Sequence, residues 1–151
     1  MQRPTLVRAL ALLLAGFAPG CWPGPEVGPA LGGQSSTISA TAPFSEIQAK
    51  VLTPSCASAL CHAGNPSPYT PMSLEAGQSW NNLVNRPAAQ APAILLVSPG
   101  HPETSYLMLK ILGTVGSSGS VSTRMPPNSA SLPSDQIDAI QGWIARGAPN
   151  D

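Results

Sequence analysis

The stretch Cys56-Ala57-Ser58-Ala59-Leu60-Cys61-His62 holds two of the chain's three cysteines and one of its two histidines. Two cysteines followed directly by a histidine are the residues that attach a c-type haem, where the usual spacing is C-x-x-C-H. In that chemistry two thiols add to the two vinyl groups of one haem, and the adjacent histidine binds the iron. The stretch therefore predicts one covalent haem c, with Cys56 and Cys61 as thioether anchors and His62 as the proximal ligand.

The spacing in this chain is C-x4-C-H, so the first cysteine is displaced by two residues from its usual place. On a regular helix, residues three apart lie about 60° from each other, whereas residues five apart lie about 140° apart. Cys56 and Cys61 therefore cannot both face a haem from one regular helix. We expect the two extra residues to bulge through the small side chains of 57–59.

Three other interpretations of the stretch remain open. Cys56 and Cys61 could form a local disulfide, which would leave His62 incidental. A zinc site needs about four ligands, which the two thiolates, His62 and His101 could supply, although no second closely spaced pair exists. A nucleophilic Cys-His pair is the weakest alternative, because catalytic partners usually come from distant parts of the sequence.

The composition describes a chain of 151 residues that is poor in charge, with seven basic and seven acidic side chains. Such a balance offers no basic stripe, which argues against nucleic-acid binding. Aromatic residues make up only 5% of the chain, so a domain built from it would have a thin core that a haem could fill. The 18 prolines and 14 glycines predict many loops.

The N-terminus has the features of an export signal. Arg3 and Arg8 precede an apolar stretch at 9–18, which is too short to span a bilayer. Cys21 follows small residues, as in a bacterial lipobox, where the cysteine becomes lipidated after cleavage. We therefore expect a signal peptide at 1–20, a location in the periplasm or cell envelope, and a possible lipid anchor on Cys21. Ordinary cleavage nearby, without a lipid, is the alternative.

A linker and one domain follow the signal. Residues 21–42 are rich in proline, glycine and serine and show no periodicity, as is typical of a flexible linker. The domain is expected at 43–151. Its apolar residues recur at helical spacing in short segments, and no segment alternates as a strand should. Helices are therefore expected near 44–53, 58–63, 79–84, 102–112 and 134–146. The buried side of the first should be formed by Phe44, Ile47 and Val51, and that of the last by Ile137, Ile140, Trp143 and Ile144. This pattern predicts an all-α domain of short helices wrapped around one covalent haem.

The sixth ligand of the iron should come from the methionines or from the second histidine. Met125 follows a long Gly/Ser loop and precedes two prolines that stiffen the backbone, which suits a thioether presented to the far face of a ring. Met72 and His101 are alternatives, as is an open or water-filled position. Met108 lies within an apolar helical segment, where a role in the core is expected. We expect Met125 to be the distal ligand.

Five segments in order resemble the small single-haem c-type cytochromes of a myxobacterial and planctomycete cytochrome c-like family. The matching segments are Ile47–His62, Asn81–Val84, Pro99–Leu107, Arg124–Pro126 and Leu132–Pro149. The resemblance covers about residues 43 to 151. It implies a cytochrome c fold in which the first and last helices cross, with Cys56 and Cys61 attached to the haem, His62 proximal and Met125 distal.

The sequence thus predicts a c-type cytochrome that carries single electrons between redox partner proteins and is not itself an enzyme. One alternative is a haem enzyme or sensor with an open sixth position, such as a small peroxidase. The other is a haem-free extracellular binding module with a Cys56–Cys61 disulfide. The partners, the reduction potential and the oligomeric state are not specified by the sequence.

Overall fold

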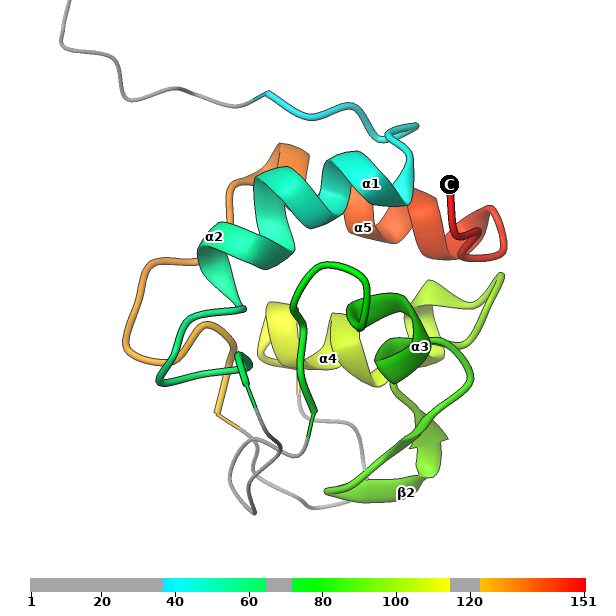
Figure 1. Ribbon diagram of the computed structural model, residues 1–151. Helices are drawn as coiled ribbons and strands as arrows, with labels where there is room; N and C mark the ends of the chain where they lie inside the picture. The colour runs from blue at the N-terminus through cyan, green and yellow to red at the C-terminus, as the bar shows by residue number, and fades with distance from the viewer. Residues whose placement is uncertain (1–36, 65–71, 115–122) are drawn as a thin grey trace, which may run out of the picture. The chain divides into compact units, whose positions relative to one another are not determined.

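A computed structural model describes residues 37–64, 72–114 and 123–151, which all belong to one compact unit, Ser35–Asp151 (Figure 1). The elements in chain order are α1 (Phe44–Ile47), η1 (Gln48–Leu52), α2 (Thr53–Ser55), α3 (Ser79–Leu83), β1 (Pro87–Ala88), β2 (Ala91–Leu95), η2 (Pro102–Thr104), α4 (Tyr106–Leu112) and α5 (Ser134–Ala145). The expected signal at 1–20 and Cys21 lie outside the described residues. None of the helices within the described ranges is long and apolar enough to cross a membrane.

The expectation of an all-α domain is wrong, because β1 and β2 form a two-stranded antiparallel sheet. Pro87 pairs with Leu95 and Ala88 with Ala91, with an irregularity in register between the two pairs. Every strand of a two-stranded sheet is an edge strand, where proline is tolerated because one side of the strand makes no ladder bonds. The prolines of these strands therefore hide the strand signal in the sequence without preventing the pairing.

The first helical segment is a continuous run of α1, η1 and α2. Phe44, Ile47 and Val51 are buried along it, which confirms the predicted apolar face. Its middle part, η1, has the wider π-helical turn, and the segment ends at Cys56, whose φ of −124° leaves the helical region. The start of the segment is capped by the last residue of the sequence. Asp151 accepts the Phe44 N–H on its side chain (2.7 Å) and the Ser45 N–H on its backbone oxygen (2.8 Å).

The last helix, α5, is the centre of the core. Its buried residues include Ile140, Trp143 and Ile144, which confirms most of the predicted stripe. Trp143 stacks on Phe44 with ring centroids 4.8 Å apart, so α5 packs against α1, and Figure 1 shows the two helices next to each other. The other side of this pair faces α4, where the candidate site lies.

Residues 37–42 pack on α5, although they fall within the range expected to be linker. Ile38 is buried, and its N–H donates to Asp135 at 3.1 Å. The guanidinium of Arg146 donates to the carbonyl oxygens of Ala40 (2.8 Å) and Ala42 (2.7 Å). The segment passes so close to α5 that a Cβ on Gly142 would meet the Ala40 oxygen at 2.1 Å.

Candidate functional site

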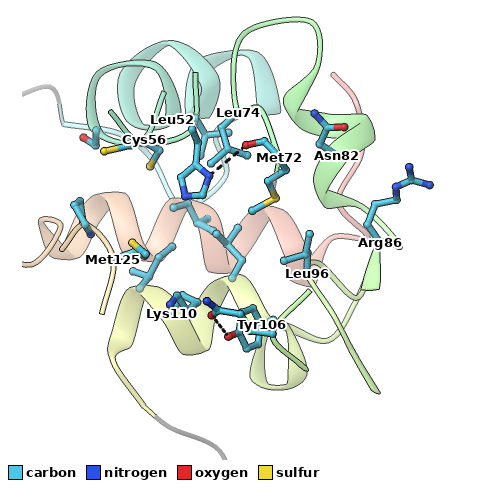
Figure 2. Close-up of a pocket in the computed structure, with 18 of the residues that line it drawn as sticks. Leu52, Cys56, Met72, Leu74, Asn82, Arg86, Leu96, Tyr106, Lys110 and Met125 are labelled. Carbon is cyan, nitrogen blue, oxygen red and sulfur yellow. Dashed lines mark hydrogen bonds between the residues drawn. The ribbon is translucent and has the colours of Figure 1, made fainter. Parts of the chain in front are cut away.

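A cavity of about 380 Å³ lies among α2, α4, α5 and the loops that carry the two cysteines and Met125 (Figure 2). Its lining includes all four residues that the sequence singles out, namely Cys56, Cys61, His62 and Met125. Much of the remaining wall is aliphatic, from side chains such as Leu52, Leu74, Leu96, Ile111 and Ile140. The volume falls within the range of about 300–1,000 Å³ that is usual for small-molecule sites.

The Cys56–His62 segment turns back on itself, and this turn brings both cysteines to the cavity. The predicted helix at 58–63 is wrong, because these residues form turns. The His62 N–H donates to the Cys56 carbonyl oxygen (3.1 Å), and the Cys61 N–H donates to that of Ser58 (2.9 Å). The two residues beyond the usual spacing are thus taken up in a compact loop, whose tip, Leu60, is 94% exposed.

The two thiols of this loop are half-buried and are not joined by a disulfide. Burial, with a smaller contribution from the charge of Cys61, raises the pKa of Cys56 to about 11. A thiol with this pKa is almost entirely protonated at neutral pH. It is therefore a poor nucleophile, because the thiolate is the reactive form. This environment does not suit the Cys-His catalytic pair.

His62 is held by a hydrogen bond to the backbone. Its Nδ1 lies 3.3 Å from the carbonyl oxygen of Met72, drawn as the dashed line at Met72 in Figure 2. A carbonyl oxygen can only accept, so Nδ1 carries the proton and Nε2 keeps its lone pair. Burial lowers the pKa of His62. The Met72 carbonyl opposes this effect and the positive charge of Lys110 adds to it. The ring is therefore neutral and in the tautomer that a metal ligand requires.

Met125 is held at the cavity by its own loop. Its backbone N–H donates to the carbonyl oxygen of Lys110 at 2.8 Å, which ties the loop to α4. The guanidinium of Arg124 donates to the carbonyl oxygens of Ser129 and Ala130, which closes the loop on itself. In Figure 2, Met125 lies across the cavity from Leu52 and Leu74. This position places a thioether sulfur on the side opposite the first helical segment.

The other candidate ligands differ in their surroundings. Met72 also lines the cavity and so remains a second possible sulfur donor. Met108 is buried in the hydrophobic core, as expected. His101 is exposed and lies beside Glu103, with 3.3 Å between Nδ1 and Oε1, and it does not belong to the described cavity lining. Within the described ranges, no three His, Cys, Asp or Glu side chains are grouped so that they could hold a metal ion. The ligands that a zinc site would need are therefore not brought together in those ranges.

Several polar residues of the cavity were missed by reasoning from the sequence. Lys110 and Tyr106 line it from α4, and the Tyr106 hydroxyl donates to Gln90 at 2.8 Å. Arg86 borders it from the loop before β1. The sequence contains one indication of this polar pair. Lys110 falls one helical turn after Tyr106, so both lie on the same side of a helix whose other residues are apolar.

Comparison of the chain with protein-family models, with curated proteins and with solved structures finds no match. The residues around the cavity are therefore what indicates the chemistry of this site.

Proposed function

We propose that the chain is an exported c-type cytochrome, which binds one haem covalently at Cys56 and Cys61 and carries single electrons between redox partner proteins. The observation that carries the proposal is the common cavity. Two cysteines and a neutral histidine line the same mostly aliphatic space as a methionine that is distant from them in sequence. Two thiols, an imidazole and a thioether are the donor set of a haem held as in cytochromes c.

The attachment needs nothing beyond the two thiols and the two vinyl groups. Each S–H adds across one vinyl C=C bond, so a C–S bond forms and the hydrogen goes to the neighbouring vinyl carbon. No oxidant is consumed and no atom is lost, so the mass of the protein rises by that of a whole haem. The hydrogen bond from the His62 N–H to the Cys56 carbonyl keeps both thiols on one loop beside the cavity.

Each of the remaining site residues has a definite role in this proposal. His62 would hold the iron through Nε2, while its Nδ1–H donates to the Met72 carbonyl and so fixes the orientation of the imidazole ring. Met125 would bind the iron through its sulfur, and thioether ligation raises the reduction potential. When bound, the haem would supply the exchange of one electron between ferrous and ferric iron. The aliphatic wall excludes water from this exchange.

The test is to export the protein from a host that has a cytochrome c maturation system and to measure its intact mass and its spectrum under denaturing conditions. A covalent haem with a c-type spectrum is expected. Cys56→Ala and Cys61→Ala should each leave a haem held by one thioether or none, whereas Ser58→Ala in the same loop should leave the attachment intact. A haem-free mass that is lighter by two hydrogen atoms would overturn the proposal and leave a disulfide-bearing module.

A further inference from the structure

Lys110 lines the cavity but has no role in the haem attachment or iron ligation proposed above. It lies on α4, whose side facing the cavity also presents Tyr106, Leu107 and Ile111. Only 9% of Lys110 is exposed, so its long side chain is nine-tenths buried. A lysine that merely covered apolar surface would extend its charged end into water.

The charge of this lysine has no acidic partner among the residues that the structure describes. There, Lys50 pairs with Glu46 and His101 lies beside Glu103, but no carboxylate is paired with Lys110. The described lining of the cavity contains no aspartate or glutamate at all. Burying an ammonium group costs free energy unless an opposite charge compensates it.

Further polar groups lie beside Lys110. Tyr106 is one helical turn earlier on the same side of α4, and its hydroxyl is bonded to Gln90. Figure 2 shows Tyr106 and Lys110 along one side of the cavity, with Arg86 at the end away from Cys56. An otherwise aliphatic cavity therefore has a polar edge along α4, formed by Lys110 and Tyr106, with a second cation, Arg86, at the end away from Cys56. Such a cavity calls for a ligand that is apolar with a negative group at its margin.

We propose that Lys110 binds a propionate carboxylate of the haem, with the Tyr106–Gln90 pair beside it. The inference rests on the proposed function and adds to it how the ligand is oriented. A haem carries its two propionates on the side of the ring away from its two vinyl groups. Thioethers at Cys56 and Cys61 therefore direct the carboxylates away from the cysteine loop and toward the polar edge.

The direct test uses the wild-type holoprotein in its ferrous, diamagnetic form. Nuclear Overhauser effects are expected between the ε-methylene protons of Lys110 and the methylene protons of one propionate. If the haem is covalently attached and these effects are absent while those to Tyr106 or Ile111 are seen, the assignment of Lys110 is overturned and the proposed function stands. If no covalent haem forms in the wild-type chain, the proposed function itself has failed.

A second test compares variants by resonance Raman spectroscopy, in which the propionate bending band reports hydrogen bonding to the carboxylates. Lys110→Met should shift this band, and Lys110→Arg should shift it less because the positive charge is kept. Lys50→Met is the matched control, since Lys50 is paired with Glu46 away from the cavity, and it should leave the band unchanged. An unshifted band in Lys110→Met, or an equal shift in the control, would contradict the proposal.

Discussion

The backbone N–H of Met125 donates to the carbonyl oxygen of Lys110 across 2.8 Å, which joins the Met125 loop to the last turn of α4. One residue of α4 thus contributes its backbone to hold the proposed distal ligand and its side chain to the cavity. Because this bond involves backbone atoms only, substitution of either side chain should leave the loop in place. The effects of Met125 and Lys110 variants can therefore be interpreted as changes in the groups that face the cavity.

Replacing Met125 by alanine should remove the sulfur ligand of the iron. The expected result is loss of the weak far-red absorption that sulfur ligation gives ferric haem, a lower reduction potential, and ready binding of CO by the ferrous protein. Met72→Ala is the matched control, because Met72 lines the same cavity and its backbone carbonyl, which holds His62, is kept. If Met72→Ala produces these changes and Met125→Ala does not, the two assignments must be exchanged. Wild-type protein that already binds CO readily would favour the open-site alternative.

The stability of the haem-free protein should depend on pH through His62, whose pKa burial lowers. The unfolded chain takes up the proton near the ordinary pKa of about 6.5, whereas the folded chain does so only at lower pH. Between these two values the unfolded state binds more protons, so the free energy of unfolding should fall as the pH drops below about 6.5 and level off below the folded pKa. Urea titrations at several pH values measure this slope, which His62→Gln should reduce. An unchanged slope would show that other groups cause it.

The thiol of Cys56 should react slowly with iodoacetamide in the folded, haem-free protein. With a pKa of about 11 rather than 9.0, only a very small fraction is thiolate at pH 8. The greater intrinsic nucleophilicity of such a thiolate offsets only part of this loss. In a Cys21→Ser, Cys61→Ser double variant, we expect alkylation of Cys56 to be at least roughly tenfold slower in the folded protein than in the same variant unfolded in urea. Equal rates in the two states would show that burial does not protect the thiol.

Gly142→Ala should destabilise the domain, although glycine to alanine in a helix is ordinarily favourable. The added Cβ would lie 2.1 Å from the Ala40 oxygen, so the segment 37–42 or α5 must move. We expect a loss of about 1–3 kcal/mol in the free energy of unfolding. Gln141→Ala, at the exposed neighbouring position, should change it by less than about 0.5 kcal/mol. A stabilised Gly142→Ala variant would show that residues 37–42 do not remain on α5.

Removing the side chain of Asp151 should weaken the start of the first helical segment, because the Phe44 N–H loses its acceptor. Asp151→Ala is expected to cost about 0.5–2 kcal/mol of stability, and Asp151→Asn clearly less, since asparagine caps helices about as well as aspartate. Thermal or urea unfolding measures both. Equal losses in the two variants would point to the charge rather than the hydrogen bond.

The parts of the fold that the sequence predicted are those with strong helical periodicity. The Phe44–Val51 face and the Ile140–Ile144 stripe are buried as expected, because their spacing leaves only one side for the core. The strands were missed since β1 and β2 are short and contain proline, which depends on their edge positions. The helix expected at 58–63 does not form, because the backbone there bonds back toward Cys56 in turns.

The residues of the candidate site also differ in whether the sequence reveals them. Cys56, Cys61 and His62 could be found because they are adjacent in sequence, and Met125 because its flanking prolines mark a stiff loop. Lys110 could not, because a lysine within a short helix is ordinarily solvent-exposed. Only the packing of α4 against the cavity shows that this lysine is buried and lines the site.

The π-helical turn η1 sets the phase of everything that follows it on the first helical segment. A turn that spans five peptide units instead of four holds one residue more than an α-helical turn. If the same residues, Gln48–Leu52, were wound as an ordinary α-helix, the side chains that follow would be rotated by about one residue's step, about 100°, around the helix axis. Leu52 and Cys56 would then no longer face the cavity together. The added residue thus acts as an angular offset that aligns the anchoring cysteine with its site.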